Sequence, residues 1–560
     1  MDTSYSIVLS GEAGQGLKTI ESLFMAMLQK SGYHAFLSKE FMSRVRGGNN
    51  TTQIRVADHE VFAPIDRIDL LVVLSRDGLK RLEKRISAQT IIIGEKTFIE
   101  SEQTPAILKP IAVSERMKEL GSAIYANNLV AGLLAGLLSC KVDVAHTMIH
   151  NQFSSKGEEV VNKNLLAFDM GLKIAKTLGI DISISTDDQV MKKVALNGSA
   201  SIGIGAIAGG CDFIASYPMS PSTAVLAYLA GKARQYGIVV EQAEDEIAAI
   251  NMALGAWYAG ARAMVTTSGG GFALMTEGVS LAGGTETPAV IHLAQRPGPA
   301  TGLPTRTEQG DLNLALYAGH GDFERVIFAP GTFDEGIRLA HRAFETADAF
   351  QVPVFLLTDQ YYLDSEAFTE RIDFSTLPVS RHIVQTKHDY KRYAITESGI
   401  SPRGIPGYGD GLVCVDSDEH TEEGRITEDF DVRIAMVDKR LRKLRAYNDV
   451  APTVIGPKDY SHLVVCWGST FGPLKEAVGQ LKDAKIALAH FSQVYPLPKQ
   501  TESLLRQAKK LILVENNATG QFGDLIKRDL GIECSEKILK YNGLQFTVEE
   551  LVDHLKGAIR

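Results

Sequence analysis

The stretch from Tyr217 to Arg296 constrains the fold most, because it alternates short apolar runs, helical patterns and polar turns. After the acids at 244–246, apolar side chains recur at i, i+3, i+7 and i+10, which predicts one buried stripe of a helix. These apolar residues are Ile247, Ile250, Leu254 and Trp257. A buried strand at 263–267 then ends in the glycines of 268–271. This alternation is typical of an α/β fold with a site at its strand ends.

The acidic residues Glu244, Asp245 and Glu246 allow two interpretations. The simpler one is helix capping, because carboxylates in a first turn stabilise a helix by up to about 1 kcal/mol. The functional one is favoured by the neighbouring segments. A Pro-containing turn, 217–220, lies upstream, and a strand downstream delivers Arg296 into a Pro/Gly-rich loop.

Composition narrows the function classes. The chain has 560 residues, which is enough for about three or four domains. Its net charge is −9 and it has no dense run of Lys and Arg, which argues against a nucleic-acid or anionic membrane surface. The apolar run 129–138 is shorter than the roughly 20 residues that span a bilayer, so we expect a buried helix there. The chain enters a strand at 6–9 without a basic leader, so we expect no signal peptide and a cytoplasmic location.

Five cysteines are scattered along the chain, and no CxxC motif occurs. They are Cys140, Cys211, Cys414, Cys466 and Cys534. The sequence therefore lacks a local pattern for zinc or iron–sulfur ligation. We expect buried free thiols, and any iron–sulfur cluster should belong to another polypeptide.

The chain is predicted to be a multidomain α/β protein. A polar connector around 180–195 separates a first Rossmann-like unit, 1–185, from a second α/β unit, 190–373. Residues 374–450 lose periodicity and are rich in Pro, Gly and charge, which is typical of a functional or irregular segment. Strands and polar strand ends alternate again over 451–560.

The first unit carries a glycine turn, Gly11–Gly16, between a predicted strand and a helix over 18–31. Backbone N–H groups in such a turn can face an anion, although tight packing explains the glycines equally well. The spacing is GxxGxG rather than the GxGxxG of a dinucleotide site. Further on, Arg44 and Arg46 precede Gly47 and Gly48.

Together these motifs resemble the α subunit of the 2-oxoacid:ferredoxin oxidoreductases, in the form with a γ domain fused at its N-terminus. The 2-oxoglutarate branch is the most similar. The glycine turn and Arg-Gly-Gly segment resemble the γ domain, with Ala13 where Gly is common. Residues 190–373 resemble the pyrimidine-binding domain of thiamine diphosphate enzymes, although Ser199-Ala200 departs from the family pattern, and 451–560 resemble a transketolase C-terminal domain.

The resemblance implies thiamine diphosphate with Mg²⁺, held mostly by a partner β subunit. The diphosphate motif of such enzymes is GDG followed about 25–30 residues later by Asn-Asn; Gly409–Gly411 has no such pair after it, and Asn516-Asn517 is too distant. We therefore expect no metal ligand from this chain. The segment 416–420 could be read as a metal cluster, but its similarity to the family favours an ordered loop.

The resemblance also assigns roles by position. Glu246, with Glu244 as the alternative, is expected to engage N1′ of the aminopyrimidine, and Arg296 and Ser220 are expected at the substrate. Catalytic roles fall on Glu246, Arg296 and Ser220; further cofactor contacts on Tyr217, Pro218, Gly269 and Gly270; further substrate contacts on Thr301 and Arg306. Planar recognition of a carboxylate is the chemistry that Arg performs best.

The implied reaction is oxidative decarboxylation of a 2-oxoacid with coenzyme A, with 2-oxoglutarate as the expected substrate and electrons passing to ferredoxin. The implied partners are a β subunit with a [4Fe–4S] cluster and ferredoxin, in an (αβ)₂ assembly. The γ domain is expected to help admit or hold coenzyme A. Alternatives are a pyruvate or branched-chain enzyme, a non-oxidative 2-oxoacid decarboxylase, and a non-catalytic α/β nucleotide-binding module.

Overall fold

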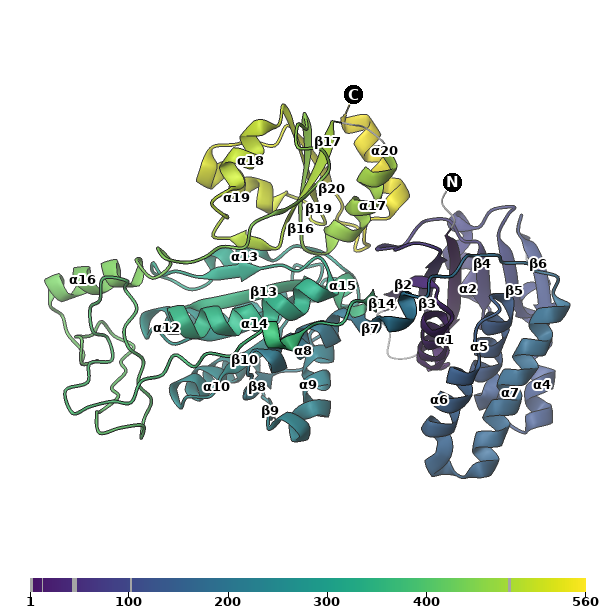
Figure 1. Ribbon diagram of the computed structural model, residues 1–560, viewed down its shortest axis with the longest axis horizontal. Helices are drawn as coiled ribbons and strands as arrows, with labels where there is room; N and C mark the ends of the chain where they lie inside the picture. The colour runs from purple at the N-terminus through teal and green to yellow at the C-terminus, as the bar shows by residue number, and fades with distance from the viewer. Residues whose placement is uncertain (1–3, 13, 43–47, 101–102, 482–484, 560) are drawn as a thin grey trace. The chain divides into compact units, whose positions relative to one another are not determined.

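The computed structural model describes residues 4–12, 14–42, 48–100, 103–481 and 485–559. The chain divides into two compact units. Unit 1 comprises residues 1–196 together with 365–371 and 547–551, and unit 2 comprises the remainder. The boundaries inferred above near 185–190 and at 373 and 450 stay predictions. Each unit is described by itself (Figure 1).

Unit 1 contains a mixed sheet of strand order β6-β5-β4-β1-β3-β2-β14-β7. The strand β1 pairs in parallel with β4 and antiparallel with β3, so the sheet changes direction beside the glycine turn. The strands are β1 (Tyr5–Glu12), β2 (His34–Glu40), β3 (Asn49–Ala57), β4 (Leu70–Val73), β5 (Ile91–Glu95), β6 (Ile107–Ile111), β7 (Val194–Asn197) and β14 (Glu366–Thr369).

Side chains of β1 and β4 belong alternately to two separate hydrophobic clusters, because successive residues of a strand point to opposite faces of the sheet. Ile7 and Leu9 join the larger cluster, and Val8 joins the smaller one. The larger cluster includes side chains of α1 (Leu17–Ser31), α5 (Ala126–Leu137), α6 (Asp143–Phe153) and α7 (Glu158–Thr177). A Cβ on Gly132 or on Gly171 would overlap the backbone of the facing helix, so α5 and α7 cross at very short range.

Unit 2 contains a largely parallel sheet of order β18-β12-β13-β11-β10-β8-β9. Its strands are β8 (Phe213–Ser216), β9 (Val239–Gln242), β10 (Ala263–Thr267), β11 (Ala289–Gln295), β12 (Val326–Phe328), β13 (Pro353–Asp359) and β18 (Gln493–Tyr495). Its main helices are α8 (Gly198–Ala208), α9 (Thr223–Tyr236), α10 (Glu246–Tyr258), α12 (Thr276–Gly284) and α14 (Phe333–Phe350). Parallel strands joined by helices confirm the predicted α/β class.

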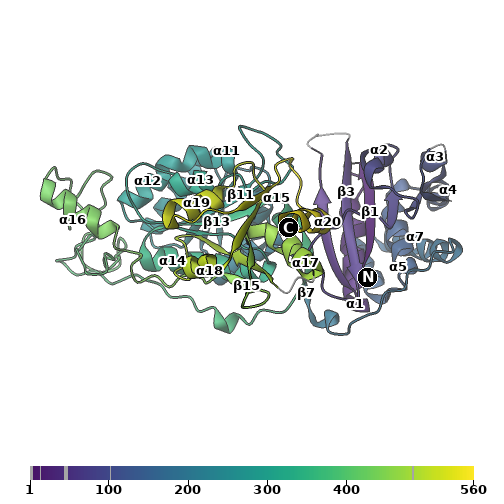
Figure 2. The same ribbon diagram turned by 90° about the horizontal axis from the view of Figure 1, so that it is seen from above.

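A second sheet of unit 2, of order β15-β17-β16-β19-β20, forms from the C-terminal region (Figures 1 and 2). It consists of β15 (Thr453–Ile455), β16 (His462–Trp467), β17 (Ile486–Phe491), β19 (Lys510–Glu515) and β20 (Glu536–Leu539), with α17 (Phe471–Leu481), α18 (Thr501–Gln507), α19 (Gln521–Leu530) and α20 (Val548–Ala558). The short strand β18 follows β17 and pairs antiparallel with β12 of the first sheet, which ties the two layers together.

The helix α10 corrects the predicted buried stripe. Ile250, Leu254 and Trp257 are buried as expected, but Ile247 is 47% exposed. The buried face instead begins at Glu246, which is 3% exposed. Because 246, 250, 253 and 257 follow the helical period, a carboxylate occupies a position where the pattern calls for an apolar residue.

Residues 374–450 are largely irregular but contain α16 (Phe430–Arg440), which the sequence pattern did not indicate. Figure 1 shows α16 at the end of an extended excursion from the first sheet of unit 2. The apolar Phe430 and Ile434 of α16 are 84% and 60% exposed, whereas Lys439 and Arg440 are buried. A search for apolar periodicity does not detect a helix whose buried side includes cations.

Buried ion pairs anchor this excursion. Lys439 Nζ and Lys443 Nζ lie 2.6 and 2.7 Å from the carboxylate of Glu286, and the two cations hold the pKa of Glu286 down to about 2 against the effect of burial. A second anchor joins Arg403 to Asp348, at 2.5 Å, and Arg262 to the same carboxylate at 2.9 Å. Charged partners thus act beside the buried Tyr393, Met436 and Tyr447 in attaching residues 374–450.

The apolar run 129–138 lies in α5 and is buried as predicted. Among the described residues, no single helix is long and apolar enough to cross a membrane; the pair 113–120 and 123–137, bent by 120°, meets that test jointly by length and composition alone. All five cysteines are free, and four of them are buried.

Candidate functional site

The candidate site lies at the carboxyl ends of β8, β10 and β11, which are neighbours in the first sheet of unit 2. The three strands lead into the turn 217–220, the glycines 269–271 and the loop after Arg296. Parallel strands direct their carboxyl ends to one edge of the sheet, and this is where open α/β sheets bind ligands. The predicted residues therefore converge because of the topology.

Glu246 opens α10, and its neighbours in the acidic run play different parts. Asp245 is the N-cap, and its carboxylate accepts a 2.7 Å hydrogen bond from Ala248 N. Glu244 is exposed and precedes the helix. Glu246 is buried, and its Oε1 has no hydrogen-bond partner among the described residues. Burial raises the pKa of Glu246, with a smaller contribution from Asp245.

The glycines 269–271, called the glycine loop below, form the start of the short helix α11 (Gly269–Phe272), and each faces a different element. A Cβ on Gly271 would overlap Oε1 of Glu246. A Cβ on Gly270 would lie 3.7 Å from the carbonyl oxygen of Ala300, in the loop after Arg296. A Cβ on Gly269 would lie 2.5 Å from both carboxyl oxygens of Asp311. The loop must therefore lack side chains at 269 and 271 for two carboxyl groups to approach it.

The structure joins Arg296 to the turn 217–220, because Arg296 Nη1 donates a 2.7 Å hydrogen bond to the carbonyl oxygen of Ser220. Burial lowers the pKa of Arg296. Ser220 and Tyr217 are exposed, and Pro218 is partly exposed. These side chains are therefore accessible to solvent at the strand ends.

The two predicted substrate contacts farther along the chain occupy the loop that leaves the site. Thr301 is exposed and Arg306 is partly exposed. The backbone N–H of Arg306 donates to Leu303 O at 3.0 Å, and the next residue, Thr307, donates its N–H to Gly543 O at 3.1 Å. The loop is thus attached at its far end to the C-terminal layer.

Asp311 and Ser268 belong to the site, and the sequence interpretation missed both. Ser268 Oγ and Asp311 Oδ2 are buried without a hydrogen-bond partner in the described part of the chain. Burial and the nearby Glu308 raise the pKa of Asp311 to about 7, while Arg296 opposes the shift. An Asp before a short helix reads as an N-cap, but Asp311 makes no side-chain cap bond. Its burial gives no signal in sequence.

His292 and Asp359 hold the strands beneath the site. The ring of His292 on β11 contacts Thr266 Oγ1 on β10 at 2.7 Å and Thr358 Oγ1 on β13 at 2.8 Å. Asp359 ends β13 and accepts hydrogen bonds from Thr307 and from Ser469 of the C-terminal layer. Burial lowers the pKa of His292 to about 3, so the ring is a neutral bridge across three strands.

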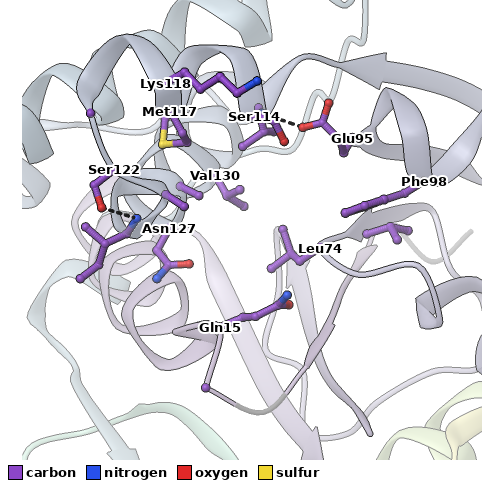
Figure 3. A pocket seen from close by; sticks show the side chains of 17 residues that line it. Gln15, Leu74, Glu95, Phe98, Ser114, Met117, Lys118, Ser122, Asn127 and Val130 are labelled. Carbon is purple, nitrogen blue, oxygen red and sulfur yellow. Dashed lines mark hydrogen bonds between the residues drawn. The ribbon is translucent and has the colours of Figure 1, made fainter. Parts of the chain in front are cut away.

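Unit 1 contains a separate pocket of about 870 Å³ at the carboxyl ends of β1, β4 and β5 (Figure 3). The glycine turn lines it through Gly14 and Gln15, while Ala13, Arg44, Arg46 and Gly47 lie outside the described residues. Phe98, Met117 and Val130 supply apolar surface, and Lys118, Asn127 and Ser122 supply polar groups. A Cβ on Gly16 would overlap the Asn127 side chain, so tight packing explains that glycine.

The two segments that sequence alone allows as metal sites have structural roles. The backbone N–H groups of Asp410 and Gly411 donate to Thr386 at 2.9 and 3.1 Å, so Gly409–Gly411 packs against a neighbouring loop. Glu419 pairs with Arg440 and Arg433, and the His420 ring lies 3.9 Å from that of Tyr393. No metal-type cluster of His, Cys, Asp or Glu occurs in the described residues.

Two family models match separate parts of the chain. Residues 204–439 match the family model "Pyruvate flavodoxin/ferredoxin oxidoreductase, thiamine diP-bdg", and residues 6–174 match "Pyruvate ferredoxin/flavodoxin oxidoreductase". A 2-oxoacid:ferredoxin oxidoreductase α subunit of Aeropyrum pernix is 30% identical, over 96% of this chain and 95% of that protein. The chain belongs to this family.

The names of two further relatives of this oxidoreductase α subunit include 2-oxoglutarate. A 2-oxoglutarate synthase subunit KorA of Archaeoglobus fulgidus is 33% identical over 66% of this chain and 100% of its own length. A solved 2-oxoglutarate:ferredoxin oxidoreductase from Magnetococcus marinus, described with 2-oxoglutarate, coenzyme A and succinyl-CoA bound, is 28% identical with a TM-score of 0.92 over 100% of both chains.

The thiamine diphosphate-binding region of this α subunit contains the whole candidate site. The chain's residues fit the aminopyrimidine end of that cofactor, because Glu246 offers a buried carboxylate oxygen that lacks a partner beside a side-chain-free loop. Such an oxygen is a ready acceptor for a ring N–H.

We predict that His292 makes the stability of this oxidoreductase subunit depend on pH. The pKa of His292 is about 3 in the folded chain and ordinarily 6.5, so below pH 6.5 the unfolded state takes up a proton that the folded state refuses. The free energy of unfolding should fall by up to about 1.4 kcal/mol per pH unit between 6.5 and about 3. His292→Gln should flatten this part of the curve.

Thermal unfolding between pH 4 and pH 8 would measure the effect, with the exposed His388→Gln variant as the control. A His292→Gln curve parallel to that of the unchanged protein would contradict the prediction.

Proposed function

We propose that this chain is the γα subunit of a 2-oxoglutarate:ferredoxin oxidoreductase, which forms succinyl-CoA and CO₂ from 2-oxoglutarate and coenzyme A. The observation that carries the proposal is the buried, unpartnered Oε1 of Glu246 beside Gly271. The family places a thiamine diphosphate region around it, and two relatives whose names include 2-oxoglutarate support the substrate.

Glu246 would hold the aminopyrimidine ring by sharing a proton between its Oε1 and ring atom N1′. Bound thiamine diphosphate supplies the carbon nucleophile and the electron sink for decarboxylation. The raised pKa of Glu246, caused by burial, suits a carboxyl group that shares a proton rather than one that is permanently ionised. The glycine loop lets the carboxylate reach its position and leaves no side chain to compete for its oxygen.

Arg296 would bind a carboxylate of the 2-oxoacid. Its Nη1 is already held by Ser220 O, which fixes the plane of the guanidinium and leaves its other N–H groups for the substrate. The exposed Ser220 hydroxyl would donate to a substrate oxygen. Arg306, farther along the same loop, would meet the second carboxylate that distinguishes 2-oxoglutarate from pyruvate.

A partner β subunit would hold the diphosphate, Mg²⁺ and a [4Fe–4S] cluster, with ferredoxin as electron acceptor and an (αβ)₂ assembly. The pocket of unit 1 would contribute to binding coenzyme A, because its volume suits a ligand of that class and it combines Lys118 with an apolar wall.

We predict opposite effects of Glu246→Gln on rate and stability. Loss of proton sharing should lower kcat by about 10²–10⁴-fold. The apparent melting temperature should rise, because a buried acid without a partner is removed. The control is Glu244→Gln, which changes an exposed carboxylate in the same acidic run. Loss of turnover in Glu244→Gln with full turnover in Glu246→Gln would refute the assignment.

We predict that Arg306→Met lowers kcat/KM for 2-oxoglutarate by about 10–100-fold, as expected for a lost charge-assisted hydrogen bond. Turnover of pyruvate should change little, since pyruvate has no second carboxylate. Anaerobic, coenzyme A-dependent dye reduction by the complex with its β subunit would compare 2-oxoglutarate, pyruvate and 2-oxoisovalerate. Arg338→Met, which removes a surface cation from α14, is the control. An equal loss on all three substrates would contradict the assignment.

We predict that Lys118→Met raises the KM for coenzyme A by on the order of tenfold, equivalent to about 1.4 kcal/mol. The KM for the 2-oxoacid should stay constant. Lys80→Met removes an exposed cation of unit 1 outside the pocket and provides the matched control. Equal KM values for coenzyme A in the two variants would exclude the pocket.

A further inference from the structure

We propose that Asp311 is a substrate-contacting residue that, in its protonated form, donates a hydrogen bond to the substrate carboxylate bound by Arg296. The proposal rests on the proposed function of Arg296 and adds a second group to the same subsite. It would make 2-oxoacid binding depend on the protonation of one side chain.

The position of Asp311 supports this role. Both of its carboxyl oxygens pack against Gly269, at the opposite end of the glycine loop from Glu246. Its backbone N–H donates to Gln295 Oε1 at 3.0 Å, and Gln295 immediately precedes Arg296. Asp311 is therefore fixed both to the glycine loop and to the strand that delivers the guanidinium.

The unmet bonding of Asp311 indicates a missing ligand. Its Oδ2 is buried without a hydrogen-bond partner in the described chain. A carboxylate near an Arg normally pairs with it, yet within the described residues Arg296 and Asp311 form no ion pair, and Nη1 of Arg296 bonds to Ser220 O instead. This arrangement of Arg296 and Asp311 leaves both side chains available to a substrate carboxylate between them.

Electrostatics decide which form of Asp311 can contact an anion. The charged groups that act on Asp311 are Glu308, in the preceding loop, and Arg296; the glycine loop contributes none. Burial and Glu308 raise the pKa of Asp311 to about 7. Below that pH the side chain is an acid that can donate to a carboxylate, as carboxylic acids in apolar sites do. Above it, the side chain carries a charge that repels the substrate.

The test is equilibrium binding of 2-oxoglutarate to the complex with its β subunit, depleted of thiamine diphosphate so that no decarboxylation follows, by calorimetry between pH 6 and pH 8.5. The Kd of the unchanged protein should rise about tenfold per pH unit above pH 7, as one deprotonation requires. Asp311→Asn keeps the shape and an N–H donor and cannot ionise, so its Kd should be nearly constant across this range. At pH 8.5 the variant should bind more tightly than the unchanged protein.

Glu308→Gln is the matched control, because it removes the neighbouring charge and leaves Asp311 intact. It should move the midpoint of the pH profile downward without abolishing the slope. A slope in Asp311→Asn equal to that of the unchanged protein would overturn the inference, and so would a flat profile in the unchanged protein. Failure of the unchanged complex to bind any 2-oxoacid would instead overturn the proposed function.

Discussion

Burying a polar atom without a hydrogen-bond partner costs on the order of 1–3 kcal/mol, and Oε1 of Glu246 bears that cost in the described chain. Favourable interactions elsewhere in α10 offset this cost. Asp245 caps α10, and the apolar Ile250, Leu254 and Trp257 continue the same buried face. Rotating the helix to expose the carboxylate would therefore also expose that apolar face.

Buried polar groups also take part in attaching residues 374–450, and there they have partners. This excursion buries Tyr393, Met436 and Tyr447, and paired charges fix it as well. Lys439 and Lys443 approach Glu286, and Arg403 approaches Asp348. Removing one member of such a set leaves a buried charge unpaired, which is far more costly than never having had the pair. Charge matching therefore helps to specify where the excursion attaches.

This difference separates what the sequence could predict from what it could not. The strand before the glycines, the strand that ends at Arg296, the start of α10 and the family follow from local patterns and motifs around Glu246 and Arg296. The predicted buried stripe of α10 was wrong only at its first position, because the pattern placed Ile247 inward and the buried carboxylate of Glu246 looked like a cap. The helix α16 was missed because its buried face is cationic. Asp311 was missed because its burial arises from contacts made across the fold.

The glycine loop shows why such a site needs residues without side chains. Gly271 admits Glu246, Gly270 lies under the Arg296 loop, and Gly269 admits Asp311. A side chain at 269 or 271 would overlap a carboxyl oxygen. Residues without side chains at the start of α11 therefore let Glu246 and Asp311 approach the same turn from its two ends. In this way the glycines determine which chemical groups can face each other.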